Sequence, residues 1–201
     1  MTNQKKALII FARKPEKGKV KTRLAATIGE EKALQIYLIL LEHTRGIAKK
    51  IFCDCFVFLT EPTKDNFWKG FFCEQQQGIT LGEKMMHAFE ILFKRGYNQC
   101  IIIGSDCPDL QKEIVENAFQ YLLNNNDVVI GPAEDGGYYL LGMKKLIPEL
   151  FINKEWSTEK VFKNTIADIE NLNLTYRILP VLNDVDEEKN IPQQWLKDLE
   201  I

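Results

Sequence analysis

An apolar run that changes abruptly into a basic loop is the feature that most restricts the folds open to this chain. Residues 7–12 are continuously apolar, which is typical of a strand buried on both faces of a parallel sheet. Pro15 and Gly18 interrupt the run, and a glycine lets the backbone approach a ligand closely. The loop carries six cationic side chains: Arg13, Lys14, Lys17, Lys19, Lys21 and Arg23.

This basic loop has two interpretations. It leads into a helix, whose first turn presents unpaired N–H groups and the positive end of the helix dipole, so the arrangement suits a phosphate. It is also consistent with a solvated surface loop, because Lys and Arg are common there. Gly18 is the only glycine of the loop and Val20 follows Lys19, which excludes a P-loop and a dinucleotide-binding fingerprint.

Composition restricts the class of protein. A formal net charge of -2 over 201 residues makes the basic loop a local feature and argues against a general nucleic-acid-binding surface. No apolar run reaches the ~18 residues of a membrane span, and Met1 to Lys6 lead into the first strand without an apolar signal core. We therefore expect a cytoplasmic protein with one α/β domain over residues 1–201. The five cysteines fit reduced structural thiols rather than a zinc site: Cys53, Cys55, Cys73, Cys100 and Cys107.

Periodicity predicts alternating helices and strands along the chain. Residues 30–50 show a broad apolar stripe at helical spacing, and 54–60 form a second strand. Strand, helix, strand is the crossover unit of a parallel sheet. We interpret the aromatic residues within 67–72 as core packing. Further strands are predicted at 99–104, 127–131 and 175–182, and further helices at 83–95, 114–122, 161–172 and 191–199.

A polar stretch at 75–82 is predicted to be a loop before the helix at 83–95. Gly78 and Gly82 in this stretch would allow a ligand to approach the backbone closely. A plain connection between two elements is the alternative.

Two carboxylates follow the predicted strand at 99–104. Ligands of open α/β sheets bind outside the carboxyl ends of the strands, so Asp106 and Asp109 are placed to hold a divalent metal beside a phosphate. The structural alternative is that Asp109 or Ser105 caps the helix that starts near Gln111. We favour the capping role for Asp109 and the ligand role for Asp106.

The acidic and glycine-containing stretch 134–137 follows another predicted strand. Asp-Gly is a strong hairpin signal, which we favour, and Asp135 could in addition place a carboxylate beside a substrate hydroxyl or a metal. Further along, residues 156–159 resemble a helix start with Ser157 as the N-cap. The last predicted strand is followed by an acidic segment that contains Asp186.

Four stretches together resemble the rSAM/selenodomain-associated transferase family, which is described as glycosyltransferase-like. They are residues 11–24 (FARKPEKGKVKTRL), 104–110 (GSDCPDL), 131–142 (GPAEDGGYYLLG) and 156–158 (WST). The resemblance covers nearly the whole chain and implies the GT-A fold of nucleotide-diphospho-sugar transferases. That fold is a three-layer α/β/α sandwich with a mostly parallel central sheet. The chain is also similar to the guanylyltransferases of the molybdenum cofactor and of 2-phospho-lactate.

The resemblance implies a set of site residues. It puts Asp106 on Mg²⁺ or Mn²⁺, with Asp186 as the second metal ligand. It also puts Arg13, Lys21 and Arg23 on the phosphates. Together with the residues singled out above, the predicted nucleotide-binding set is Ala12, Arg13, Lys14, Gly18, Lys21, Arg23, Gly78 and Gly82, and the predicted catalytic set is Lys21, Arg23, Asp106 and Asp135. Two stretches depart from related patterns. Residues 12–15 stand where nucleotidyltransferases have a glycine-rich loop, and residues 105–107 hold one acid where glycosyltransferases have Asp-x-Asp.

These features predict a metal-dependent transferase with a nucleotide or nucleotide-sugar donor and a small-molecule acceptor. Nucleotidyl transfer from a nucleoside triphosphate to a phosphorylated acceptor is one alternative, which the six loop cations favour. Glycosyl transfer is the other, which the acidic turn at 134–135 and the family resemblance favour. A non-catalytic nucleotide-binding protein is the third. The residues indicate neither a particular base nor an oligomeric state.

Overall fold

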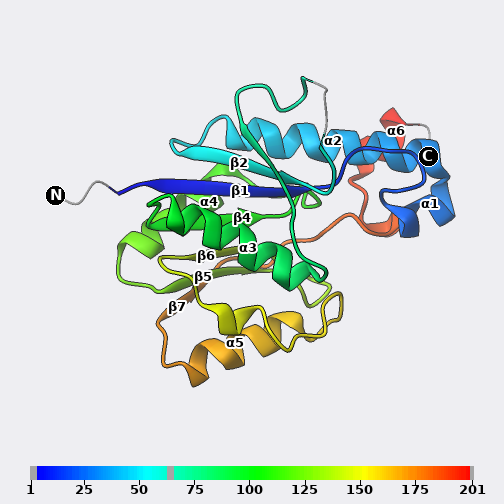
Figure 1. Cartoon of the computed structure of the whole chain (residues 1–201). Helices are drawn as coiled ribbons and strands as arrows, with labels where there is room; N and C mark the ends of the chain where they lie inside the picture. Colours follow the sequence, from blue (N-terminus) through cyan, green and yellow to red (C-terminus); the bar gives the residue numbers. More distant parts are fainter. Residues whose placement is uncertain (1–3, 63–65, 200–201) are drawn as a thin grey trace.

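A seven-stranded sheet runs through the middle of the structure, with helices on both of its faces (Figure 1). The computed structural model describes residues 4–62 and 66–199, so Met1 to Asn3 of the N-terminal stretch lie outside the described residues. The strands are β1 (Lys6–Ala12), β2 (Asp54–Leu59), β3 (Phe72–Gln75), β4 (Gln99–Ile103), β5 (Val128–Pro132), β6 (Tyr138–Met143) and β7 (Tyr176–Ile178). The α-helices are α1 (Thr22–Ile28), α2 (Glu30–Ala48), α3 (Leu81–Lys94), α4 (Lys112–Leu123), α5 (Val161–Asn171) and α6 (Gln193–Asp198).

The strand order is β3-β2-β1-β4-β6-β5-β7, and β6 is antiparallel to both of its neighbours. β1 is an interior strand, where Ile9 pairs with Phe56 of β2 on one side and with Ile102 of β4 on the other. The chain builds β2 and β3 on one side of β1 and then crosses to β4 on the other. Ligands of open α/β sheets bind at such a switch point, outside the carboxyl ends of the strands.

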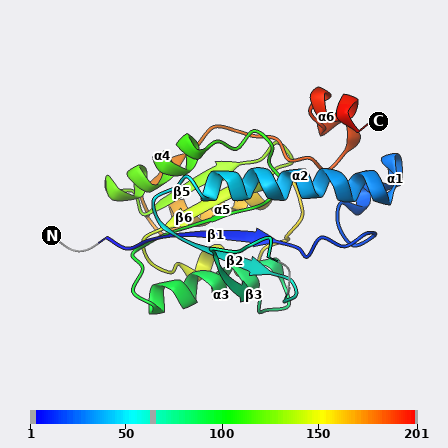
Figure 2. The ribbon, with the colours of Figure 1, turned by 90° about the horizontal axis from the view of Figure 1, so that it is seen from above.

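Helices α2 and α4 cover one face of the sheet and α3 covers the other (Figure 2), and alternate residues of β1 pack against the two layers. Leu8 and Ile10 pack with buried residues of α2 and α4, whereas Ala7 and Ile9 pack with buried residues of α3 and α5. A continuous apolar run is needed for such a strand because both of its faces are covered. The predicted three-layer sandwich with a mostly parallel sheet is therefore confirmed.

The two edge strands differ most from the predictions. β3 was not predicted, and it includes Phe72, whose exposed fraction of 56% departs from the predicted core role. The last strand is much shorter than the predicted range 175–182: β7 ends at Ile178, and an isolated bridge joins Leu182 to Ala133. Edge strands have a partner on one side only, so their sequences show a weaker apolar pattern.

Two predicted helix caps are wrong. α4 begins after Gln111 without a side-chain cap, so Asp109 does not cap it. Ser157 does not cap α5 either, because the N-cap is Lys160 and Ser157 itself has a positive φ of 64°. Capping depends on backbone direction at the helix start, which residue type alone does not determine.

No helix within residues 4–62 and 66–199 is long and apolar enough to cross a membrane. In the same described residues, none of the cysteines forms a disulfide. The assignment of residues 1–201 to one domain stays a prediction.

Asp127 joins the starts of β5 and β7. Its Oδ2 accepts hydrogen bonds from the backbone N–H of Thr175 at 3.0 Å and from the Thr175 hydroxyl at 2.7 Å. The pKa of Asp127 is lowered overall. Partial burial alone would raise it, but the hydrogen bonds from Thr175 and the charge of Lys144 outweigh this effect.

The Asp127 contribution should depend on pH. Since the pKa is lowered by folding, the carboxylate stabilises the fold above its ordinary pKa of about 3.9, and this stabilisation is lost at lower pH. We expect Asp127→Asn to lower the free energy of unfolding by about 1 kcal/mol at neutral pH. The difference from wild type should shrink as the pH falls below about 4. Urea unfolding of wild type and Asp127→Asn at several pH values measures the difference in their free energies of unfolding. A difference that does not change with pH would contradict the prediction.

Candidate functional site

A cavity of about 990 Å³ opens at the carboxyl ends of the central strands. The end of β1, the start of α1, the end of β4 and the turn between β5 and β6 all contribute to its wall. β6 runs antiparallel to β4, so its first residues and the preceding turn reach the same sheet edge as the ends of β1 and β4. Predicted site residues that line the cavity are Ala12, Arg13, Lys21, Arg23, Asp106, Asp135 and Asp186.

Lys21 lies between two carboxylates of this cavity. Its Nζ is 2.6 Å from Oδ1 of Asp106 and 3.1 Å from Oδ1 of Asp186, and its side chain is only 4% exposed. Burial alone would lower the pKa of Lys21, but the two carboxylates outweigh it and raise the pKa. Lys21 also has left-handed backbone angles (φ 49°, ψ 44°), which are uncommon for a residue with a side chain and occur often at functional sites.

Asp186 reaches this position through packing of its neighbours. The backbone N–H of Val185 donates to the carbonyl of Asp106 at 3.0 Å, and Val185 is buried in a cluster with residues of α1 and α2. Arg23 Nη1 approaches Oδ2 of Asp186 at 3.6 Å. Burial, followed by the nearby charges of Asp106, Asp135 and Asp186, raises the pKa of Asp184 to about 7. The site is therefore rich in negative charge as well as cations.

Tyr37 of α2 positions the start of the basic loop. Its hydroxyl accepts a hydrogen bond from the backbone N–H of Arg13 at 2.7 Å and donates one to the Arg13 carbonyl at 3.0 Å. Burial, together with the nearby charge of Asp106, raises the pKa of Tyr37 to about 12, so the hydroxyl keeps its proton at neutral pH. The apolar stripe of the helix predicted Tyr37 as a core residue but gave no signal of this contact.

Tyr37→Phe should loosen the loop without disturbing the core. We expect a loss of about 1–2 kcal/mol in the free energy of unfolding, because two backbone groups lose their partner. Chemical denaturation measures this loss. Tyr176→Phe is the control, because its hydroxyl contacts only Glu170 near the surface, and an equal loss in both variants would contradict the prediction.

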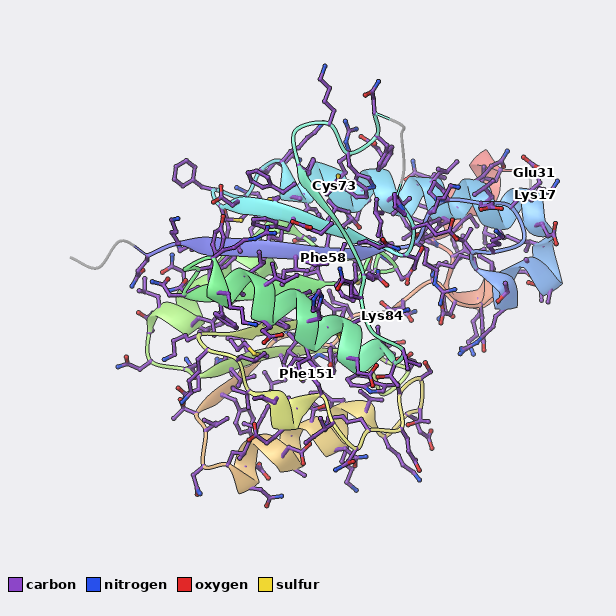
Figure 3. The ribbon with its side chains drawn as sticks, viewed as in Figure 1. Lys17, Glu31, Phe58, Cys73, Lys84 and Phe151 are labelled. Carbon is purple, nitrogen blue, oxygen red and sulfur yellow. The ribbon has the colours of Figure 1, made fainter. Side chains whose placement is uncertain are left out.

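Half of the loop cations do not face the cavity. Lys14 approaches Glu16 and Glu61, and Lys19 pairs with Glu16 at 2.9 Å. Lys17 pairs with Glu31 at 2.9 Å near the start of α2, where Figure 3 shows both side chains well away from Lys84 of α3. Of the predicted nucleotide-binding residues, Lys14 and Gly18 do not line the cavity. Gly18 lies next to Glu30 of α2: a Cβ added to this glycine would be 3.2 Å from the Glu30 carboxylate.

Gly78 and Gly82 do not line the cavity either. Gly82 lies in the first turn of α3 rather than in a loop, because Thr80 and Glu83 form a capping box that starts the helix earlier than predicted. A Cβ on Gly82 would lie 2.5 Å from the Phe151 carbonyl oxygen, so this glycine permits close packing of α3. Lys84, which sequence reasoning missed, reaches the cavity from the same helix.

One part of the cavity wall is acidic and aromatic. The predicted hairpin between β5 and β6 is confirmed, and Asp135 Oδ1 accepts a hydrogen bond from the Gly137 N–H at 2.8 Å in its turn. Tyr138 and Trp156 pack edge to face with their ring centroids 6.5 Å apart. Glu159 also lines this wall. Trp156 and Glu159 were seen only as part of a helix start, so their approach to the cavity was missed.

The donor set fits a divalent metal bound together with phosphate. Asp106 and Asp186 converge on one cation, the Lys21 ammonium. Mg²⁺ is commonly held by one or two carboxylates, with water and substrate phosphates as the other ligands. Among the residues that the structure describes, no group of three or more His, Cys, Asp or Glu side chains is arranged for a metal.

The sheet order and the cavity at its switch point define a protein of the nucleotide-diphospho-sugar transferase fold class. A proposed nucleotide-diphospho-sugar transferase from Desulfovibrio desulfuricans G20 is similar in structure, with a TM-score of 0.86, 30% identity, and coverage of 96% of this chain and 91% of that one. The chain belongs to DUF2064, a family described as an uncharacterized protein conserved in bacteria, whose profile matches residues 44–158. The GT-A-like relationship that the motifs implied is thereby confirmed.

More distant structures share the fold alone. CMP:2-keto-3-deoxy-manno-octonic acid synthetase in complex with CTP has a TM-score of 0.62 and 12% identity, with coverage of 98% of this chain and 100% of that one. A 4-diphosphocytidyl-2C-methyl-D-erythritol synthase from Anaerococcus prevotii DSM 20548 has a TM-score of 0.56 and 13% identity, with coverage of 98% and 93%. No curated protein sequence matches the chain significantly.

Proposed function

We propose that this protein is a transferase that binds a nucleotide-diphospho-sugar and transfers the sugar to a hydroxyl acceptor. The observation that carries the proposal is that cationic and acidic side chains line the same cavity. Arg13, Lys21 and Arg23 supply positive charge, and Asp135 and Glu159 form an acidic part of the wall. A volume of about 990 Å³ lies at the upper end of the range for ligand sites, which suits a donor and an acceptor bound together.

The distribution of charge favours a diphosphate donor. Three of the six loop cations pair with glutamates and do not line the cavity. Of the other three, Lys21 is already close to two carboxylates. The loop therefore offers a ligand less positive charge than its sequence indicates, with Lys84 of α3 as a further cation of the cavity. This balance suits two phosphates better than three.

The acidic wall suits an acceptor with hydroxyl groups. Asp135 Oδ1 is held by the Gly137 N–H, which orients the carboxylate in the cavity wall. In the proposed reaction the acceptor oxygen bonds to the sugar carbon, the bond from that carbon to the diphosphate breaks, and Asp135 takes the acceptor proton. A phosphorylated acceptor would meet repulsion from Asp135 and Glu159 on this wall.

Asp106 and Asp186 would hold Mg²⁺ or Mn²⁺ beside the donor. A bound divalent ion supplies charge neutralisation for the phosphates. Arg13 and Arg23 would bind the phosphate oxygens and stabilise the charge that develops on the leaving nucleoside diphosphate. Their role is mainly to position the donor and to compensate its charge.

Nucleotidyl transfer is the second candidate function. It is supported by the names of the two more distant fold relatives, one of which was solved with CTP. In that reaction an acceptor phosphate would attack the α-phosphorus of a triphosphate. A non-catalytic nucleotide-binding protein is less well supported, because the candidate metal ligands, cations and acidic wall all meet in one cavity.

A thermal-shift panel of nucleotide-diphospho-sugars and nucleoside triphosphates, each with and without Mg²⁺, tests the proposal. Ligand concentrations of about 100 Kd stabilise a protein by about 2.7 kcal/mol, so the preferred class should be clear. We expect a Mg²⁺-dependent shift with a nucleotide-diphospho-sugar. Arg13→Gln should lose most of it, whereas Lys19→Gln, a matched change in the same loop away from the cavity, should keep it.

Other outcomes of the panel would redirect the proposal. A Mg²⁺-dependent shift with triphosphates alone would indicate nucleotidyl transfer. Tight binding without metal, together with the absence of turnover when acceptors are added, would indicate a binding protein.

A further inference from the structure

The position of Lys21 bears on how a metal could enter the cavity. Its ammonium lies 2.6 Å from one carboxylate and 3.1 Å from the other, and these are the two side chains proposed as metal ligands, Asp106 and Asp186. A divalent ion coordinated by the same two oxygens would occupy the same space. Two cations at such a short separation repel each other strongly, most of all where water is excluded.

Lys21 is buried between the two carboxylates. The side chain is 4% exposed, so its charge has little access to water. Its backbone is left-handed at the N-cap of α1, and from there its ammonium reaches both carboxylates. In contrast, the side chain of Arg23 is 68% exposed and stands 3.6 Å from Asp186, so it makes a looser contact.

We propose that Lys21 blocks metal binding in the nucleotide-free protein and that the metal therefore enters together with the nucleotide phosphates. The inference rests on the proposed function, because a phosphate oxygen in the cavity would give the displaced ammonium a new partner. Lys21 has a flexible stem that lets its ammonium move from a carboxylate to a phosphate while its backbone stays in place. Metal and nucleotide should then each raise the affinity for the other, as binding linkage requires.

Mn²⁺ binding to the nucleotide-free protein tests this directly, measured by electron paramagnetic resonance of free Mn²⁺. We expect Lys21→Met to bind Mn²⁺ at least about tenfold more tightly than wild type, because the competing cation is gone. The double variant Lys21→Met/Asp106→Asn should lose this gain, which would place the ion at the two carboxylates.

Lys84→Met is the matched control. It removes one positive charge from the same cavity, yet among the described ion pairs Lys84 contacts neither Asp106 nor Asp186. It should change the Mn²⁺ affinity much less than Lys21→Met does. An equal gain would show a general charge effect and overturn the proposal.

Two further results would overturn it: no tighter Mn²⁺ binding by Lys21→Met, or Mn²⁺ bound by wild type as tightly without nucleotide as with it. Lys21→Gln, which keeps a hydrogen-bond donor for the carboxylates, gives the same comparison if the Met variant does not fold. Because the comparison of Lys21→Met with wild type contains no nucleotide, its result is independent of the thermal-shift panel. Suppose that Lys21→Met binds Mn²⁺ more tightly but no nucleotide-diphospho-sugar gives a thermal shift. The result would then support the role of Lys21 in blocking metal binding and contradict the proposed function.

Discussion

Asp106→Asn is expected to reduce the rate of transfer by at least about 100-fold with the donor that the thermal-shift panel identifies. The substitution keeps the shape of the side chain and removes its negative charge, so it would weaken the proposed metal site and the contact with Lys21 at once. The fold should survive. Asp106 is 43% exposed in its side chain, and an amide oxygen can still accept a hydrogen bond from Lys21.

The rate is measured as product formed per time by mass spectrometry, and the fold is checked by thermal unfolding. Asp109→Asn is the matched control, because it removes the same charge three positions away in the same segment, from an exposed residue that does not line the cavity. Its rate should stay within about twofold of wild type. If Asp106→Asn unfolded the protein, the residue would be structural; if it kept full activity, the proposed metal and phosphate chemistry would be wrong.

Gly136→Ala is expected to lower the free energy of unfolding by about 2–4 kcal/mol. A Cβ at this position would lie 2.2 Å from the backbone carbonyl oxygen of Glu159, and φ is +86°, which strains any residue with a side chain. The Gly136 carbonyl also accepts a hydrogen bond from the Phe162 N–H at 2.9 Å. In the Gly136→Ala variant, the hairpin turn and the segment before α5 therefore cannot both keep the positions they have in the wild-type protein.

Gly96→Ala separates the two causes, because Gly96 has a φ of +85° and open space around its Cβ. It should cost only about 1 kcal/mol. Chemical denaturation measures both variants. Similar losses would mean that the hairpin and the segment before α5 are less tightly packed than the structure shows. Gly136→Ala should also reduce ligand stabilisation, since Asp135 and Glu159 both line the cavity.

Much of the sheet follows from local pattern. Residues 7–12 of β1 and 100–103 of β4 are continuous apolar runs, as expected for strands that helices cover on both faces. The β5–β6 hairpin follows from the Asp-Gly turn, because φ at Gly136 is positive and glycine accepts this without strain. Asp109 and Ser157 failed as caps because their residue types favour a cap without fixing the direction of the backbone.

The sequence by itself determined that a basic segment and several carboxylates would follow strand ends at one edge of a sheet. Only the tertiary structure decided which of them meet. Lys14, Lys17 and Lys19 look like Lys21 in the sequence, yet nearby glutamates hold the first three outside the cavity. Lys21 instead contacts Asp186, which is 165 positions away. Local pattern reports backbone preference and burial, whereas the partner of a charge depends on how distant segments pack.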